Sequence, residues 1–248
     1  MHANAIAIAV LFFVLAGAAF GAGPVSVPLP SVQTVFSARL TPDQLPARGR
    51  ASVSLELTEA IGTPDGSHPP ALHELGLELD RHWGLSVKGV PVCPGPLNES
   101  GPRTGISAIC EDSKIGSGSI EAEVAFPEQQ PVRTGGQVVV YNGGVRGDRT
   151  KIWVYAYFSA PATGAILMPL QVRRDSNGIY GWTGTLSVPK IANGGGSITD
   201  LSLKFGKGIF SATCPTGKWQ GRASAHFVDG SVGGGAFVQR CRTAPASS

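Results

Sequence analysis

Apolar and polar residues alternate over several segments of the chain, a pattern typical of β-strands with one buried face. The residues expected on those buried faces are Val53, Leu55 and Leu57, then Leu75, Leu77 and Leu79, and then Ile120, Ala122, Val124 and Phe126. Residues 150–159 are apolar or aromatic at nearly every position, which predicts a strand that is covered on both faces.

Turn signals separate the predicted strands. Residues 142–144 (Asn-Gly-Gly) are expected to end one strand, and residues 206–208 (Gly-Lys-Gly) are expected to form a hairpin turn. Pro169 restricts residues 165–172 to an edge or bulged strand, because proline cannot donate a ladder hydrogen bond. About a dozen strands and no substantial helix are expected. This predicts an all-β fold, an antiparallel β-sandwich of the jelly-roll or Ig-like kind.

An uninterrupted apolar run occupies residues 5–20 and is followed by small residues. It predicts a signal peptide over residues 1–22, with an uncleaved signal anchor as the alternative. Residues 23–248 would then form one β-sandwich domain. Alternation alone leaves open a second arrangement, in which two smaller β units span about residues 32–126 and 137–241.

Composition narrows the class of protein further. Charged residues make up 15% of the chain, too few for a disordered chain. The formal net charge of +3 comes from scattered basic residues, which gives no footprint of nucleic-acid binding.

Four cysteines allow three pairings, and we favour two local disulfides, Cys93–Cys110 and Cys214–Cys241. Zinc is the alternative use of these cysteines, but there is no Cys-x-x-Cys motif. We expect a secreted or cell-envelope protein.

Several short motifs carry a resemblance to a known family. They are Pro-Asp-Gly and Pro-Pro-Ala-Leu within residues 64–72, Leu-x-Leu-Asp at 77–80, Gly-Val-Pro-Val-Cys at 89–93, Cys110 with residues 114–118, residues 200–208, and residues 214–218 with Cys241. On these residues the chain resembles a family of exported bacterial all-β proteins, of actinobacterial type, whose function is unknown. It departs from the family pattern at residues 111–112 and around Trp153. The resemblance implies export, disulfides and a β fold, and it implies no activity.

Catalytic signatures are absent from the sequence, which has no Gly-x-Ser-x-Gly, His-Glu-x-x-His or P-loop motif. We therefore expect no catalytic residues and no cofactor, and a hydrolase is only the third hypothesis. His68 and His73 are weak candidates for metal ligands, because two histidines five residues apart in a Pro-rich loop need further ligands to form a site. No metal is expected.

Trp153, Tyr155 and Tyr157 alternate along one predicted strand and are the sharpest functional lead. Exposed rings in this arrangement could stack on sugars, which makes a carbohydrate-binding module the alternative hypothesis. If a loop covers them, they are ordinary packing residues. The first hypothesis is an exported structural or interaction module of unknown specific function. Its partner would be a cell-surface glycan or another envelope protein. No nucleic acid is expected, and membrane contact is expected only through an uncleaved signal segment.

Overall fold

The computed structural model describes residues 31–94, 108–159, 163–175 and 178–244, so the expected signal peptide lies outside the described residues. The strands are β1 (Gln33–Thr41), β2 (Gln44–Leu45), β3 (Ala51–Gly62), β4 (Leu72–Asp80), β5 (Trp83–Leu85), β6 (Lys114–Val124), β7 (Val132–Arg146), β8 (Arg149–Phe158), β9 (Gly164–Arg174), β10 (Tyr180–Ser187), β11 (Gly196–Ala212), β12 (Lys218–Phe227), β13 (Val232–Arg240) and β14 (Arg242–Thr243). Two 3₁₀ turns, η1 (Glu111–Ser113) and η2 (Ala192–Gly194), interrupt them. Within these ranges no helix has the length and apolarity needed to span a membrane.

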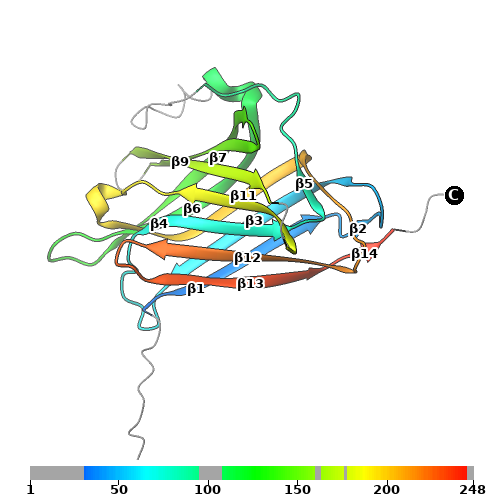
Figure 1. Cartoon of the computed structure of the whole chain (residues 1–248). Coiled ribbons are helices and arrows are strands. Elements are labelled where there is room, and N and C mark those ends of the chain that lie inside the picture. Colours follow the sequence, from blue (N-terminus) through cyan, green and yellow to red (C-terminus); the bar gives the residue numbers. More distant parts are fainter. Residues whose placement is uncertain (1–30, 95–107, 160–162, 176–177, 245–248) are drawn as a thin grey trace, which may run out of the picture.

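Twelve strands form one antiparallel sheet, and Figure 1 shows how this sheet curls around the core. The order is β1-β3-β11-β6-β7-β8-β9-β10-β4-β12-β13, with β5 paired to β11. The two ends of this order, β1 and β13, lie side by side, so the sheet is nearly closed into a barrel. The expected all-β class, with about a dozen strands and no substantial helix among the described residues, is confirmed. The two packed sheets expected of a β-sandwich are here parts of one continuous sheet.

Segments from distant parts of the sequence alternate in this sheet. β11 lies between β3 and β6, and β4 lies between β10 and β12. Leu55 of β3 and Phe205 of β11 belong to the same core cluster. Strands of residues 32–126 and of residues 137–241 therefore share both ladders and packing.

The alternating pattern on β3 corresponds to burial as expected. Val53 and Leu55 have no exposed surface, and Leu57 is 8% exposed. The expectation fails for Phe126, which is 41% exposed because β6 ends at Val124, before it. Alternation thus identified the buried face and overran the end of the strand.

The glycines at 206–208 do not form the expected hairpin turn. β11 continues through them, and residues on both sides pair with the same strand, Phe205 with Leu55 and Phe210 with Val53. Gly208 has a φ of +99°, and its N–H donates to Ser52 Oγ at 2.8 Å. The glycines therefore form a bulge, because the positive φ lets extra residues leave the ladder without reversing the chain.

The signal at 142–144 likewise forms a bulge, and β7 continues to Arg146 instead of ending at the expected turn. The Asn142 side chain donates to the carbonyls of Val90 (2.9 Å) and Pro91 (3.1 Å), and the Asn142 carbonyl accepts from the Cys93 N–H at 2.8 Å. The bulge therefore anchors the segment that leads into the first disulfide.

Both disulfides join the pairs that we favoured from the sequence, Cys93–Cys110 and Cys214–Cys241. The first lies on the outer face of the sheet with Val139 and Tyr155. The second belongs to the main core. Two disulfides are consistent with an extracellular, oxidising location.

The junction between β1 and β13, which we call the β1–β13 seam, differs from every other junction in the sheet. Eleven strands follow one another in antiparallel order, so the first and the eleventh must run parallel. Within the described residues no backbone ladder joins them. Instead, Gln239 Oε1 accepts from the Leu40 N–H at 3.0 Å and Gln239 Nε2 donates to the Leu40 carbonyl at 3.3 Å. The rings of Phe36 and Phe237 pack across the seam with centroids 5.4 Å apart.

The continuation of the seam is more firmly joined. β2 and β14, which follow β1 and β13 along the chain, form a short parallel pair. The Arg242 N–H donates to the Asp43 carbonyl at 2.8 Å, and the Arg242 side chain pairs with the Asp43 carboxylate at 3.0 Å. Cys241, held by its disulfide to Cys214, directly precedes Arg242. The seam is thus fastened by backbone bonds at the β2–β14 end and by side chains along β1 and β13.

Candidate functional site

The aromatic residues on the outer face of β8 are largely covered. Tyr155 is 1% exposed and packs with the Cys93–Cys110 disulfide and Val139, while Trp153 and Tyr157 are half-buried at the border of this cluster. Lys151 Nζ lies 4.5 Å from the centroid of the Trp153 ring. The structure therefore offers no continuous exposed stripe of the three rings, and only the border of the cluster can meet a ligand.

His68 and His73, the weak metal candidates, point to different partners. His68 contacts Ser197 and Glu123, whereas the His73 ring lies 6.3 Å from the His226 ring. In the part of the chain that the structure describes, no group of three or more His, Cys, Asp or Glu side chains is placed to hold a metal ion.

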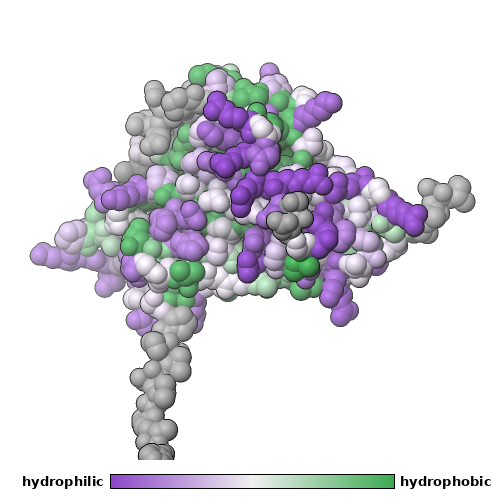
Figure 2. Space-filling view, in the orientation of Figure 1, coloured by the Kyte–Doolittle hydropathy of each residue, from purple (hydrophilic) through white to green (hydrophobic). Residues whose placement is uncertain are grey.

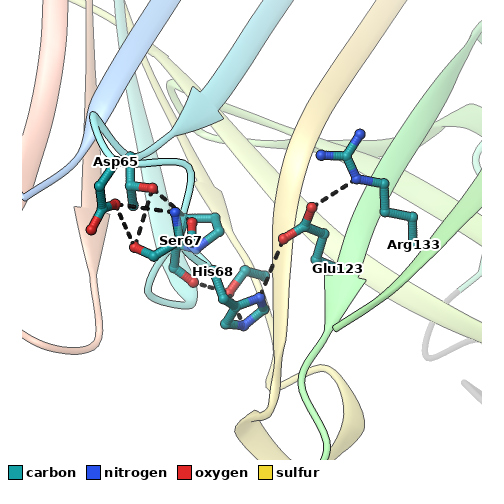
Figure 3. A network of polar contacts seen from close by, with 8 residues as sticks. Asp65, Ser67, His68, Glu123 and Arg133 are labelled. Atoms are coloured by element: carbon teal, nitrogen blue, oxygen red, sulfur yellow. Dashed lines mark hydrogen bonds and ion pairs between the residues drawn. The ribbon is translucent and has the colours of Figure 1, made fainter. Parts of the chain in front are cut away.

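A chain of polar contacts that sequence reasoning missed runs from the β3–β4 loop to β7 (Figure 3). His68 Nε2 lies 3.2 Å from Ser197 Oγ, and His68 Nδ1 lies 3.5 Å from Glu123 Oε2. Arg133 Nε donates to Glu123 Oε1 at 2.8 Å. Asp65, at the other end of the loop, accepts from the backbone and hydroxyl of Ser67.

The order serine, histidine, carboxylate resembles a catalytic triad, but the contacts of Ser197 rule out that use. In a triad the serine hydroxyl donates to the histidine. Here Ser197 Oγ donates to the Pro69 carbonyl at 2.5 Å, so its single hydrogen is already used. Ser197 is also 1% exposed and cannot reach a substrate. The network therefore fastens the β3–β4 loop to β11 and β6 and gives the hydrolase hypothesis no support.

The outer face of β7, β8 and β9 carries three arginines in register, which we call the arginine row. Arg146 lies opposite Arg149 in the β7–β8 ladder, and Arg149 lies opposite Arg173 in the β8–β9 ladder. All three side chains are exposed. Like charges directly opposite each other in a ladder repel and destabilise the sheet. Among the described residues no ion pair includes any of the three, which leaves the row uncompensated.

The next charges along the same face are paired with each other. Arg173 lies opposite Thr183 of β10, and Thr183 lies opposite Glu78 of β4. Glu78 accepts a short hydrogen bond from Arg222 of β12. Glu78, the carboxylate in this line, lies two strands away from Arg173 and is already paired with Arg222.

Two adjoining depressions follow the arginine row on the surface. The larger, of about 580 Å³, is bordered by Arg146, Arg149 and Lys151. The smaller, of about 250 Å³, is bordered by Arg149 and Arg173. Both share Arg149 and Gln171, and no carboxylate is found among the described residues that line them. They form one cationic groove over four strands, β7 to β10.

Hydroxyl groups line the far side of this groove. Thr183, Thr185 and Ser187 follow one another on the outer face of β10. Figure 2 shows a band of hydrophilic residues across the middle of the face turned to the viewer. The groove thus combines guanidinium groups with neutral hydrogen-bonding side chains.

The chain matches no protein-family model, and no curated protein or solved structure matches it significantly. The resemblance to an exported actinobacterial family therefore stays a prediction.

Sequence reasoning missed the arginine row because its members come from three strands, β7, β8 and β9, and meet only through strand pairing. Arg146 and Arg149 flank the short turn at Gly147-Asp148, which was not predicted because the turn signal at 142–144 took its place. Arg146 and Arg149 directly flank Gly147-Asp148 in the sequence. This spacing was a usable signal for their pairing, since residues that flank a two-residue hairpin turn face each other.

Proposed function

We propose that the protein is an exported binding module that recognises an acidic glycan of the cell envelope or the cell exterior through the cationic groove. The arginine row carries the proposal. Three exposed arginines in register lower the stability of the sheet, and a local cost without a local compensation is typical of a functional site. An anionic ligand would remove that cost on binding.

The chemistry of the groove favours carboxylated sugars. Arginine forms paired hydrogen bonds to carboxylates and does so better than lysine. The hydroxyls of β10 and the amide of Gln171 are suited to sugar hydroxyls, which both donate and accept. Beside the groove, the half-buried Trp153 ring lies against Lys151, which borders the larger depression, and it could offer a small apolar contact for a sugar face.

The groove crosses several strands and is open, which suits a polymer better than an isolated small molecule. A polymer that presents one carboxylate per sugar could contact more than one member of the arginine row at once. Attraction between exposed charges weakens with salt, so binding should fall steeply as ionic strength rises. The open, charged groove supports an interaction module. In the carbohydrate-binding hypothesis, the arginine row thus takes the place of the stripe of three aromatic rings as the ligand-binding feature.

Calorimetric titration with polygalacturonate, with neutral dextran as comparison, tests the proposal. We expect binding of polygalacturonate that weakens between 50 and 300 mM NaCl and no binding of dextran. The double variant Arg149→Gln/Arg173→Gln should lose at least about tenfold in affinity, because two charge-assisted contacts are removed.

Arg240→Gln is the matched control. Arg240 is exposed and also lies opposite a cation, Lys218 of β12, but it borders neither depression. Its replacement should leave the affinity unchanged. Equal affinity of the double variant and the wild type contradicts the proposal. A loss on Trp153→Ala without any loss in the double variant would favour aromatic stacking instead.

A further inference from the structure

A carboxyl group lies among apolar residues inside the sheet. Glu59 occupies the position on β3 that follows Leu57 on the buried face, where the alternating pattern requires an apolar residue. Its ladder neighbours are Phe36 of β1 and Leu201 of β11. Glu59 is 4% exposed, and its Oε2 atom has no hydrogen-bond partner among the described residues. A buried carboxyl oxygen without a hydrogen-bond partner lowers the stability of the fold. Glu59 Oε2 therefore lacks a hydrogen-bond donor.

Glu59 borders a small cavity. The cavity has a volume of about 30 Å³ and is otherwise lined by Phe36, Thr58 and leucines of β3, β4, β9, β10 and β11. A second space of about 20 Å³ shares Leu57, Leu77 and Leu170 with it. A buried water requires on the order of 10–15 Å³ by such a measure. The first space is therefore larger than a single water requires, and the second space adjoins it at the three shared leucines.

We propose that this cavity binds a small aliphatic amine, whose ammonium group donates to Glu59 Oε2 and whose carbon chain lies among the leucines. The ammonium group supplies both the missing donor and the missing positive charge, and an unbranched chain matches the apolar lining. A neutral alcohol would supply the donor alone, and a carboxylate would repel. The cavity lies inside the sheet and the arginine row on its outer face, so either site can exist without the other.

The β1–β13 seam provides the entrance. Phe36 borders the cavity on one side and packs against Phe237 across the seam on the other. No backbone ladder among the described residues holds β1 to β13, so separation of these two rings breaks no strand pairing. The neighbouring contact between Thr34 and Gly233 is equally a side-chain contact, because a Cβ at Gly233 would lie 2.5 Å from the Thr34 methyl group.

NMR titration of the isotope-labelled full chain at pH 8 tests the ligand class. The probes are methylammonium to pentylammonium chloride, with 1-butanol and sodium butyrate as comparisons. We expect saturable shifts at Leu57, Leu201 and Glu59, with affinity rising about fourfold for each methylene until the cavity is full. Butyrate should give no such shifts. Equal affinity for 1-butanol and butylammonium would overturn the assignment of an amine.

Glu59→Gln keeps the size of the side chain and removes its charge. It should weaken butylammonium at least about tenfold, while its spectrum shows an intact fold. The matched control is Glu56→Gln, which changes a partly exposed carboxylate on the same strand. Unchanged affinity in Glu59→Gln, or shifts confined to surface residues, would refute the site.

The entrance has its own test. Phe237→Ala should accelerate both association and dissociation of butylammonium, because it removes the ring that closes the seam. Val238→Ala, on the same strand with an outward side chain that is 63% exposed, is the matched control and should leave both rates unchanged. Unaltered rates in Phe237→Ala would show that the ligand enters elsewhere and would overturn the seam as entrance.

Discussion

Arg149 of β8 lies directly opposite Arg173 of β9, and Arg146 of β7 lies opposite Arg149 on its other side. No described carboxylate forms an ion pair with any of them. Elsewhere in the sheet opposite charges form ion pairs, as in Arg222–Glu78 and Lys204–Glu56, although Lys218–Arg240 and Glu121–Asp200 are further pairs of like charge. The arginine row differs from these pairs because it borders the two depressions of the groove, which is why we connect it with binding.

Removal of one charge from the arginine row should stabilise the protein. For Arg173→Gln we expect the free energy of unfolding to rise by about 0.2–1 kcal/mol at 20 mM NaCl and the gain to shrink at 500 mM NaCl. Urea unfolding at both salt concentrations measures this. Arg222→Gln, which loses the partner of Glu78, should show no gain. A loss of stability in Arg173→Gln at low salt would mean that the row is compensated by contacts we have not identified.

Glu59 should make stability depend on pH. Burial raises the pKa of its carboxyl from 4.5 to about 7, and no charged group contributes to the shift. Because the folded state keeps the proton to higher pH than the unfolded state, stability is greatest at low pH and falls as pH rises from about 4.5 through 7. The total loss is about 3 kcal/mol.

Glu59→Gln lacks this ionisation. Its free energy of unfolding, relative to that of the wild type, should rise by about 3 kcal/mol between pH 4.5 and pH 8. Urea unfolding across this range measures the difference, and Glu56→Gln serves as the control for an outward carboxylate on the same strand. A difference that does not change with pH is incompatible with a neutral Glu59 in the fold.

Tyr155 and Tyr157 should behave differently although both belong to the same alternating set. Tyr155 is 1% exposed beneath the first disulfide, so Tyr155→Ala should cost about 3–5 kcal/mol, in the range of large-to-small aromatic substitutions. Tyr157 is half-buried, so Tyr157→Ala should cost less than half as much. Chemical unfolding of both variants gives the comparison. Equal losses would show that the cover over Tyr155 contributes little.

The Cys93–Cys110 disulfide belongs to the outer cluster and joins two cysteines with a sequence separation of 17. Cys93→Ala/Cys110→Ala should cost about 3 kcal/mol in the chain-entropy model and should speed amide exchange at Val139 and Tyr155. Cys214→Ala/Cys241→Ala should leave exchange in that cluster unchanged, because this disulfide belongs to the other cluster. Similar exchange in both variants would argue against a specific cover.

Local pattern sufficed to predict much of this fold. Alternation identified the buried face of β3, and spacing favoured the disulfide pairs that the structure contains. Glycine signals were less informative, because a positive φ serves a bulge as well as a turn. Residues 142–144 and 206–208 are bulges for this reason.

Pro169 shows a second limit of local pattern. It was expected on an edge or bulged strand, yet β9 lies between β8 and β10. The ladder between β9 and β10 covers Leu170 to Arg174 and so begins one residue after Pro169, where the missing N–H is not needed for pairing with β10. Strand order depends on long-range pairing, which no window of sequence contains. The groove depends on that order, since it brings Arg149 and Arg173 together.

The most direct test of the acidic-glycan proposal is an NMR titration that follows the arginine side-chain Nε–Hε resonances as a trigalacturonate oligomer is added. The resonances of Arg146, Arg149 and Arg173 should shift together and saturate, while those of Arg222 and Arg240 stay in place. Shifts at Arg240 equal to those at Arg149, or no shift at any arginine, would contradict binding at the arginine row.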